Sequence, residues 1–374
     1  MKIGIISSLE LRTPPEKYGG TELIVSHVAE GLVARGHDVT LFASGDSITK
    51  AHLIPGSEKA LMPAGYPINP NAAYLLMCDR VVRMSGSFDV IHNNLGWRFL
   101  PFVRHCACPV VNTYHSDYTH PRVKWMFEAY PELIYTSLSE NHQKHVAITF
   151  SGMVYNGIDV DAIPFSDKTH SQSMVNIGRF DEQKGSHIAL DVSIALNKHI
   201  QVIGRPETEN QKQYAYFTEQ IEPLIRKANS TMYGEVGPKE KSEILLNSRL
   251  FLFPVSWEEP FGLVITESMA CGTPIVAYAR GSIPEIVEDG VTGFIVNSSD
   301  ADIRGDWIVK KTGVEGLHEA VTRIYDMPEK AYQTMRSACR DRVKKYFTVD
   351  RMVEGYIEVY EKVVKGKYPL PNAV

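Results

Sequence analysis

One stretch, from Leu250 to Ala279, constrains the fold more than any other part of the chain. It begins with the apolar run Leu250–Val255, which has the length and character of a buried strand. Pro260 stands just ahead of a second apolar segment, and a proline near the first turn of a helix costs nothing because its missing N–H would have no partner there. Pro274–Tyr278 again reads as a strand. We therefore predict a strand, a turn, a helix and a further strand, with free helix N–H groups that form an anion-binding site at the turn.

The same alternation of strand and helix runs along most of the chain, as it does in α/β proteins. Near the N-terminus, Lys2–Ser8 reads as a strand that is apolar on both faces, and Thr21–Arg35 reads as the helix after it. The pattern starts afresh at Met174, after a polar stretch that reads as a linker. A length of 374 residues suits two domains of ordinary size. We expect two doubly wound α/β domains, residues 1–168 and residues 172–346.

Composition and charge argue against several classes of protein. A formal net charge of −5 disfavours a nucleic-acid binder. The chain contains no apolar run of about eighteen residues, which a membrane-spanning helix needs. The N-terminal MKIGIISS has too short an apolar run for a signal peptide, so we expect a cytoplasmic protein. The five cysteines lack the spacing of zinc ligands and fit buried thiols in a reducing compartment. GxGxxG is absent, which disfavours an ordinary dinucleotide oxidoreductase.

Two carboxylates flank the turn before the predicted helix. Glu259 lies at the mouth of the turn, and Glu267 shares a helix face with Leu263, four residues before it. A helix start that holds phosphate, with carboxylates nearby for hydroxyl groups, suits a ligand that is diphosphate in the middle and polyhydroxyl at both ends. A nucleotide-sugar has that composition. From the residues alone, the alternative is a surface Glu-Glu-Pro turn with Glu267 as an ordinary solvated helix residue.

The segment EPFG(x)4E(x)MACGTP(x)VA, which begins at Glu259, resembles the signature of the retaining glycosyltransferases of family 4, also called glycosyltransferase group 1. The resemblance implies the GT-B architecture, in which two Rossmann-like, doubly wound domains face each other across a cleft. It implies that Glu259 lies near the hydroxyls of the donor sugar and Glu267 near the ribose. It also implies that residues 172–346 bind the nucleotide-sugar, that residues 1–168 bind the acceptor, and that the last helix, about residues 347–365, packs back on the first domain.

Further donor-binding residues follow from the same resemblance. Arg179 and Lys184, in GRFDEQKG after the strand at Met174, are close to the family pattern for the cations of the donor diphosphate. Two positive charges neutralise a diphosphate and stabilise the negative charge that grows on it as the glycosidic bond breaks. Without the resemblance they read as surface charges beside Asp181. The other residues expected at the donor, including those of the GEVGPKEK segment that holds the base, are Gly19, Gly20, Gly234, Glu235, Val236, Phe261, Gly262, Leu263 and Val264.

The loop LRTPPEKYGGTE lies between the first predicted strand and the first predicted helix. In a doubly wound domain such a loop lies over the carboxyl ends of the strands, where ligands bind. Gly19 and Gly20 permit close approach of the backbone to a phosphate or an acceptor. The family resemblance implies that this pair faces the diphosphate and the acceptor, and a bare turn is the alternative.

Two histidines, His92 and His115, fall at predicted strand ends. A lone histidine is more often structural than functional, and that interpretation is favoured for His92. NTYHSD resembles the family segment in which a histidine faces the transferred sugar, which implies that role for His115, with Asp117 as a weaker candidate. The apolar pieces LGWRFLPFV and KWMF read as core, and an acceptor wall or a lipid-surface contact is the alternative.

We interpret the sequence as a glycosyltransferase, a hexosyltransferase, that moves a sugar from a UDP-sugar or GDP-sugar to a hydroxyl acceptor and retains the anomeric configuration. The expected catalytic residues are His115, Arg179, Lys184 and Glu259. We expect no cofactor and no metal, because the two cations and the helix start can meet the charge of the diphosphate. The acceptor is not readable from the sequence, and a membrane contact has only weak support. One alternative is a nucleotide-sugar epimerase or hydrolase on the same scaffold, and the other is a sugar-nucleotide-binding protein without catalysis.

Overall fold

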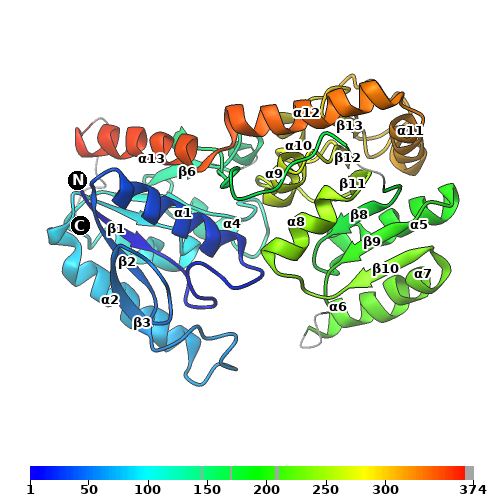
Figure 1. The fold of residues 1–374 in the computed structure, drawn as a ribbon. Coiled ribbons are helices and arrows are strands. Elements are labelled where there is room, and N and C mark those ends of the chain that lie inside the picture. The colour runs from blue at the N-terminus through cyan, green and yellow to red at the C-terminus, as the bar shows by residue number, and fades with distance from the viewer. Residues whose placement is uncertain (145, 169–170, 207–209, 367–374) are drawn as a thin grey trace. The chain divides into compact units, whose positions relative to one another are not determined.

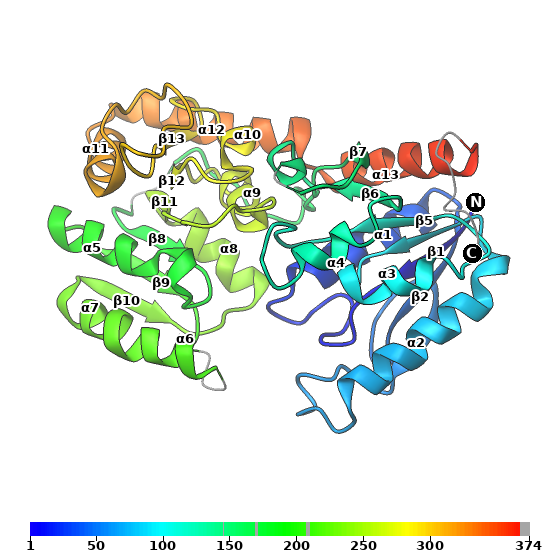
Figure 2. The same cartoon turned by 180° about the vertical axis from the view of Figure 1, so that it is seen from behind.

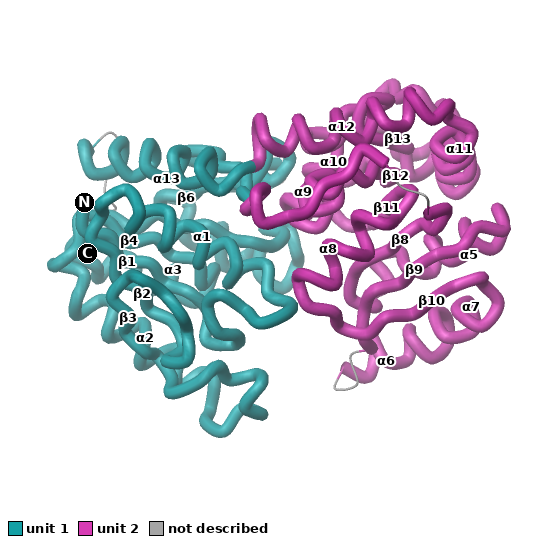
Figure 3. Tube along the Cα trace, viewed as in Figure 1, with its two compact units in different colours: residues 1–158, 348–374 teal, residues 159–347 magenta. Residues whose placement is uncertain are grey.

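The structure is a computed structural model that describes residues 1–144, 146–168, 171–206 and 210–366. The chain divides into two compact units, which are coloured separately in Figure 3. Unit 1 comprises residues 1–158 together with the chain from Thr348 onward, and unit 2 comprises residues 159–347. Each unit is built on one parallel β-sheet, so the predicted α/β class is confirmed. Residues 169–170 of the expected linker lie outside the described residues.

The sheet of unit 1 has seven strands in the order β3-β2-β1-β4-β5-β6-β7. All neighbours pair in parallel, and Ile3 at the centre is in register with Val39 on one side and Val90 on the other. Buried, β-branched and aliphatic residues fill the central strands, as expected for a sheet that is covered on both faces. The strands are β1 (Lys2–Ile6), β2 (Asp38–Ser44), β3 (His52–Ser57), β4 (Val90–Asn93), β5 (Val110–Thr113), β6 (Ile134–Ser137) and β7 (Phe150–Met153).

Helices cover both faces of this sheet (Figures 1 and 2). One face carries α2 and α3, whose Met77, Val81 and Leu100 join a single buried cluster with the strands. The other carries α1 and α13, which pack so closely that a Cβ on Gly31 would lie 2.5 Å from a methyl group of Val353. The α-helices are α1 (Gly20–Ala34), α2 (Pro70–Met84), α3 (Leu100–Val103), α4 (Lys124–Glu128) and α13 (Val349–Val364), with 3-10 turns η1 (Ser85–Ser87), η2 (Gly96–Phe99) and η3 (Asn141–Gln143).

The sheet of unit 2 has six parallel strands in the order β10-β9-β8-β11-β12-β13. Its central strands β8, β11 and β12 contribute Met174, Leu252 and Val276 to one buried cluster beneath the helices. The strands are β8 (Met174–Ile177), β9 (Ile200–Ile203), β10 (Ser230–Tyr233), β11 (Leu250–Phe253), β12 (Ile275–Tyr278) and β13 (Gly293–Val296).

Two buried arginines of α12 tie the helices of unit 2 together. Arg336 donates to the carbonyls of Leu246 and Cys271, at the C-terminal ends of α8 and α9, and Arg340 donates to Ala270 at 2.9 Å. The helices of unit 2 are α5 (Ser186–Leu196), α6 (Gln211–Tyr216), α7 (Glu222–Lys227), α8 (Pro238–Leu246), α9 (Leu263–Ala270), α10 (Ile283–Ile286), α11 (Gly313–Tyr325) and α12 (Glu329–Tyr346), with a 3-10 turn η4 (Glu182–Lys184) and a π-helical turn η5 (Phe217–Ile221).

The sequence also predicts a strand from Val154, followed by an Asn-Gly turn, and this expectation is wrong, because β7 ends at Met153. Pro260 lies just ahead of its helix, since α9 begins at Leu263 behind the left-handed cap Gly262. The end of the chain, from Leu317 to Lys365, reads as helical in the sequence, and the structure forms it from three helices, α11, α12 and α13. Among the described residues, no helix combines the length and apolar character that crossing a bilayer requires.

Candidate active site

The strand order of unit 2 reverses at one point, between β8 and β11. Strands β9 and β10 continue from β8 on one side, and β12 and β13 continue from β11 on the other. Loops that leave such neighbouring strands in opposite directions open a crevice at the carboxyl ends, where open α/β sheets bind their ligands. Lys184 follows β8 and Glu259 follows β11, so the fold places two of the predicted residues beside this switch point.

Lys184 and Glu259 are in direct contact. Lys184 Nζ lies 2.8 Å from Glu259 Oε2, and the two side chains are only 17% and 10% exposed. Trp257 donates from Nε1 to the same oxygen at 3.0 Å, and its ring centroid lies 4.2 Å from Lys184 Nζ. A largely buried carboxylate that accepts from a cation and an indole N–H has a fixed orientation. In the described part of the chain, its other oxygen, Oε1, has no hydrogen-bond partner.

Neighbouring loops hold the backbone around Glu259 from both sides. On one side, the Ser256 N–H donates to the Gln183 carbonyl at 2.9 Å. On the other, the Ser282 N–H donates to the Glu259 carbonyl at 2.9 Å. Gly281 has φ +56°, and a Cβ there would lie 2.2 Å from the carbonyl oxygen of Glu259. Only glycine therefore fits at this approach between the loops after β11 and β12.

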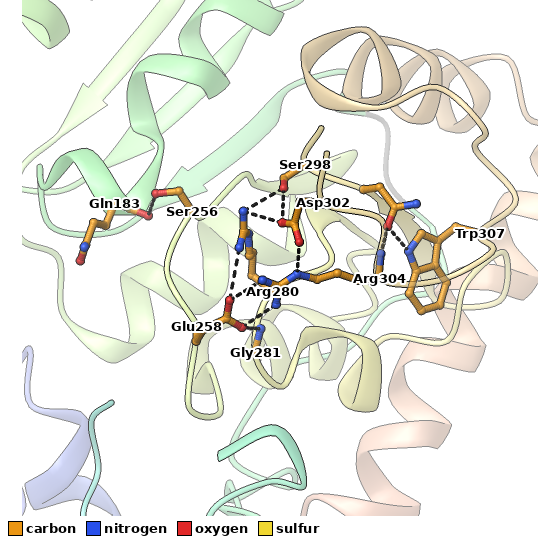
Figure 4. A network of polar contacts seen from close by, with 10 residues as sticks. Gln183, Ser256, Glu258, Arg280, Gly281, Ser298, Asp302, Arg304 and Trp307 are labelled. Atoms are coloured by element: carbon orange, nitrogen blue, oxygen red, sulfur yellow. Dashed lines mark hydrogen bonds and ion pairs between the residues drawn. The ribbon is translucent and has the colours of Figure 1, made fainter. Parts of the chain in front are cut away.

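Glu258, the residue before Glu259, anchors the same loop through an ionic network (Figure 4). Its carboxylate pairs with Arg304 at 2.7 Å and Arg280 at 3.3 Å, and it accepts from the Gly281 N–H at 2.8 Å. Asp302 pairs with the same two arginines. Burial alone would raise the pKa of Glu258, but the hydrogen bonds from Arg304 and Gly281 outweigh burial and lower it. The network joins the loops after β11, β12 and β13.

The N-terminus of α9 completes this arrangement. Gly262 caps the helix with φ +81°, and the buried Phe261 anchors the chain just before it. The first-turn N–H groups of Leu263 and Val264 have no acceptor within the helix, and they point out of its positive end. These are the N–H groups from which the sequence predicts an anion-binding site.

Glu267 lies one turn further along α9, where Lys241 from α8 contacts it at 2.7 Å. The side chains are 12% and 23% exposed, so the pair is partly shielded from water. Lys241 was not predicted. The sequence shows only a lysine in KEKSEIL, and its pairing with a residue 26 positions away has no local signal.

The remaining predicted residues of unit 2 lie on exposed or half-buried loops. Arg179 follows β8 and is exposed, without a side-chain hydrogen bond or ion pair to any other residue that the structure describes. Gly234, Glu235 and Val236 form the loop between β10 and α8. Glu235 lies 3.5 Å from Arg205, which follows β9. Among the described residues, neither Arg179 nor this loop forms a hydrogen bond or ion pair with Lys184 or Glu259.

In unit 1 the strand order reverses between β1 and β4. Gly19 is the N-cap of α1 with φ +151°, and Gly20 is the first residue of that helix, so both lie where the loop after β1 meets α1. Glu22 in the first turn is buried and accepts a hydrogen bond from the Ser8 hydroxyl. Burial raises the pKa of Glu22. The predicted glycines therefore lie at a switch point of their own.

His115 lies two residues beyond β5, and its ring is held by one hydrogen bond. Nε2 lies 2.9 Å from the amide oxygen of Asn94, and because that oxygen only accepts, Nε2 carries the proton. Nδ1 is buried and lacks a partner among the residues described. Burial, with a smaller contribution from His142, lowers the pKa of His115 to about 3, so the ring is neutral near pH 7. A neutral ring with a free Nδ1 lone pair can accept a hydrogen bond from a hydroxyl group.

The structure gives His92 and Asp117 structural roles. His92 is fully buried; its two nitrogens contact the hydroxyls of Tyr360 at 2.7 Å and Thr113 at 2.8 Å, which joins α13 to the sheet. Asp117 accepts from the backbone and hydroxyl of Thr119 within a turn. Of the apolar pieces, LGWRFLPFV supplies core residues, whereas the Trp125 side chain of KWMF is 63% exposed.

The expectation that no metal is needed also assumed that the chain has no Asp-x-Asp triplet, and this is wrong, because the sequence contains two. In one, Asp302 pairs with Arg280 and Arg304, and Asp300 accepts from the Thr312 hydroxyl. In the other triplet, which begins at Asp159, the Asp159 carboxylate accepts a hydrogen bond from the backbone N–H of Ala162. Within the described residues, no group of three or more His, Cys, Asp or Glu side chains is arranged to hold a metal ion.

Two family models match the chain. The model described as Glycosyl transferases group 1 covers residues 165–341, and the model described as Glycosyltransferase Family 4 covers residues 18–151. Among curated proteins, the phosphatidyl-myo-inositol mannosyltransferase of Mycobacterium leprae is 24% identical over 375 residues, which cover 90% of this chain and 96% of that protein. An uncharacterised 41.2 kDa protein of Klebsiella pneumoniae is 30% identical over 188 residues, but this match spans only 50% of this chain and 45% of that protein.

Solved structures share the fold over nearly the whole chain. Sucrose-phosphate synthase from Thermosynechococcus elongatus superposes with a TM-score of 0.77 at 19% identity, covering 98% of this chain and 100% of that one. Anabaena HepE, solved in complex with UDP and glucose, superposes with a TM-score of 0.71 at 19% identity, covering 96% of this chain and 99% of that one.

Proposed function

The chain belongs to the group 1 glycosyltransferases of the GT-B fold, and from this premise we propose that it transfers a hexosyl group from a nucleotide diphosphate sugar to a hydroxyl acceptor with retention of configuration. The contact between Lys184 and Glu259 at the switch point of unit 2 carries the proposal. This contact places a cation that can bind phosphate beside a carboxylate that can accept from hydroxyl groups. Both lie next to the free N–H groups of α9. Unit 2 then holds the donor and unit 1 the acceptor.

The donor diphosphate binds to three positive elements of unit 2. Lys184 and the first turn of α9 lie at the switch point, and Arg179 extends from the loop after β8. These charges neutralise the diphosphate and stabilise the charge that grows on it as the bond to the sugar breaks. The donor is a UDP-sugar or a GDP-sugar. The Anabaena relative in fold was solved with UDP and glucose, which supports the first of these.

The two ends of the donor meet different groups. Glu259 accepts hydrogen bonds from sugar hydroxyls through Oε1, the oxygen that neither Lys184 nor Trp257 contacts. His115 accepts another sugar hydroxyl at Nδ1. Glu267 binds the ribose, and the loop Gly234–Val236 contacts the base. Gly19 and Gly20 allow the backbone of unit 1 to approach the diphosphate and the acceptor.

Transfer proceeds on the front face of the sugar. As the bond from the anomeric carbon to the phosphate oxygen breaks, the bond to the acceptor oxygen forms on the same side, and the leaving phosphate oxygen takes the acceptor's proton. A double displacement would need a carboxylate that is free to attack from the opposite face. Glu259 is held by Lys184, Trp257 and the loops around it, and these contacts suit hydroxyl binding rather than attack.

Proton NMR of the first product tests the stereochemistry. An α-linked donor is expected to give an α-linked product. A β-linked product would contradict retention, and a glycosyl adduct on Glu259, detected by mass spectrometry of the denatured enzyme, would exclude the front-face route alone. The reaction is also expected to proceed in excess chelator. Activity that disappears there and returns with manganese or magnesium would contradict metal independence.

A donor screen tests the function itself. The protein is incubated with UDP-sugars and GDP-sugars, with and without candidate acceptors, and nucleotide release is measured. The proposal predicts release that a suitable acceptor accelerates and a product that contains both sugar and acceptor. Free sugar or an epimer formed at the same rate without acceptor would indicate a hydrolase or an epimerase. Binding without turnover for every donor and acceptor would indicate a non-catalytic binding protein.

A further inference from the structure

A second cluster of uncommitted polar groups lies at the switch point of unit 1. It is formed by the loop after β1 and by η2, which follows β4. The two strands are neighbours in the sheet, and the Asn94 N–H donates to the Ile6 carbonyl at 3.1 Å, so the two connections leave the sheet side by side. This is the part of unit 1 in which the topology favours a ligand.

The Arg98 side chain of η2 stacks on aromatic rings and donates no hydrogen bond to another described residue. Its guanidinium carbon lies 5.0 Å from the ring centroid of Tyr74 and 4.8 Å from that of Trp97, and the residue is half-buried. Nowhere in the described ranges does it meet a hydrogen-bond acceptor or a carboxylate. By contrast, Arg35 and Arg104 of the same unit each pair with a carboxylate at 2.8 and 2.5 Å. Stacking fixes the plane of the Arg98 guanidinium and leaves its N–H donors available.

Glu10 presents an uncommitted acceptor beside the same ring. Its Oε1 lies 3.3 Å from the hydroxyl of Tyr74, whose position is fixed by the Leu9 N–H at 3.0 Å. Its Oε2 is buried and has no hydrogen-bond partner in the structure as described. A buried carboxylate oxygen without a donor costs free energy, and a ligand hydroxyl would remove that cost. Arg98 thus stacks on the ring of Tyr74, and Glu10 accepts from the hydroxyl of the same tyrosine.

The chemistry of the two groups restricts the ligand. A stacked guanidinium presents a planar fork of donors, which matches phosphate or carboxylate oxygens, whereas a carboxylate accepts from hydroxyls and repels anions. Packing alone would explain the ring contacts of Arg98, but it leaves the unpartnered Glu10 Oε2 on the same tyrosine without explanation.

We propose that Arg98 and Glu10 recognise the acceptor, and that this acceptor carries an anionic group, phosphate or carboxylate, next to hydroxyl groups. The inference rests on the proposed function, since it assigns the acceptor class of the same enzyme. Arg98 binds the anionic group, and Glu10 accepts from a hydroxyl.

Direct titration tests this inference without requiring turnover. Glucose 6-phosphate, glucuronate and glucose are titrated into the full-length protein, and vesicles with and without phosphatidylinositol test whether the anionic group belongs to a lipid. At least one anionic probe is expected to bind about tenfold or more tightly than glucose, the difference that one charge-assisted hydrogen bond supplies. Preference for the vesicles identifies a lipid headgroup, and preference for a soluble probe identifies a free sugar acid or phosphate.

Substitutions at Arg98 and at Arg104 distinguish specific recognition by Arg98 from a general effect of the protein's positive charge. Arg98→Gln is expected to abolish the preference for the anionic probe, and Arg98→Lys to restore part of it. Arg104→Gln is the matched control, because Arg104 lies in the same segment, also stacks on a tyrosine at 5.3 Å and is already paired with Glu132. It should leave the preference unchanged, and all variants should keep the wild-type melting temperature.

Binding of UDP and GDP, measured in the same samples, separates the inference from the proposed function. If neither nucleotide binds to the wild-type protein, the proposed function fails, whereas the anionic probes still decide the inference. Equal binding of glucose and the anionic probes, an undiminished preference in Arg98→Gln, or an equal loss in Arg104→Gln would overturn the inference.

Discussion

At the residue scale, the proposed donor site depends on the orientation of one carboxylate. Glu259 is largely buried, and Lys184 and Trp257 both contact its Oε2. The cation is therefore set where the diphosphate is proposed to bind, and Oε1 is left for the sugar. Neither group could take this position alone, because an unpaired charge at such a site is strongly disfavoured.

Lys184→Ala is expected to lower turnover by about a hundredfold, since it removes charge stabilisation that is largest in the transition state. It also leaves Glu259 without its cation, so the free energy of unfolding should fall by about 1–3 kcal/mol, the cost of a buried acceptor left without its donor. Lys198→Ala is the matched control, because Lys198 also lies over an aromatic ring, that of Tyr325 at 4.4 Å, and belongs to the same unit. Steady-state kinetics and urea unfolding provide both measurements. A variant with raised donor KM and wild-type kcat would contradict the role in the transition state.

Glu267→Ala is expected to weaken donor binding more than turnover, because the ribose lies away from the reacting carbon and is bound equally in ground and transition states. Lys241→Ala removes the partner of the same carboxylate and should produce a smaller change of the same kind. Donor dissociation constants and single-turnover rates separate the two effects. A fall in the single-turnover rate with unchanged donor affinity would show that the ribose assignment is wrong.

At the element scale, the structure explains how the loop after β11 keeps its shape. Hydrogen bonds to the loop after β8 and from the loop after β12 hold its backbone, and the ionic network of Glu258 extends the support to the loop after β13 (Figure 4). The sequence predicted β11, α9 and β12 around this loop, because the apolar runs there have the length of strands and helices and a proline or glycine marks the turns. It did not predict the contacts among loops, since Gly281 and Glu258 are 23 residues apart and nothing local records their pairing.

Gly281→Ala tests this support. A Cβ at residue 281 would lie 2.2 Å from the Glu259 carbonyl oxygen, so the loops must separate and donor affinity should fall by about tenfold or more. Gly313→Ala is the matched control. The φ of Gly313 is +58° against +56° for Gly281, and the atom nearest to the added Cβ, the Ser298 carbonyl oxygen, lies 3.5 Å away. Both variants bear the strain of a left-handed residue, about 1 kcal/mol, but only the first should lose affinity. Equal losses in the two variants would show that the packing at Glu259 does not matter.

At the scale of the whole molecule, two buried histidines and the half-buried His115 make stability depend on pH. Burial lowers the pKa of His92 and His115 to about 3 and that of His142 to about 4, all below the ordinary value of 6.5. As the pH falls below about 6.5, the unfolded chain binds protons that the folded chain does not. The stabilisation is therefore complete above about pH 6.5 and is lost towards pH 3 to 4, with a slope of up to about 1.4 kcal/mol per pH unit for each histidine. Glu22, whose pKa is raised, acts in the opposite direction.

Urea unfolding of the wild-type protein at several pH values between about 7.5 and 4.5 measures this slope. His142 accepts from the Leu138 N–H at Nδ1 and lies 2.7 Å from the Ser116 carbonyl at Nε2, so it is neutral in the folded state. His142→Asn should remove the contribution of one proton to the slope. A free energy of unfolding that stays constant from pH 6.5 to 4.5, or a slope that His142→Asn leaves unchanged, would contradict the assignment.

The position of the diphosphate tests the central claim most directly. The measurement is a crystal structure of the protein with the nucleoside diphosphate that the donor screen selects. The account predicts phosphate oxygens within hydrogen-bond distance of Lys184 Nζ and of the N–H groups of Leu263 and Val264, with the ribose beside Glu267. A diphosphate bound elsewhere in unit 2, or at the switch point of unit 1 between β1 and β4, would contradict it.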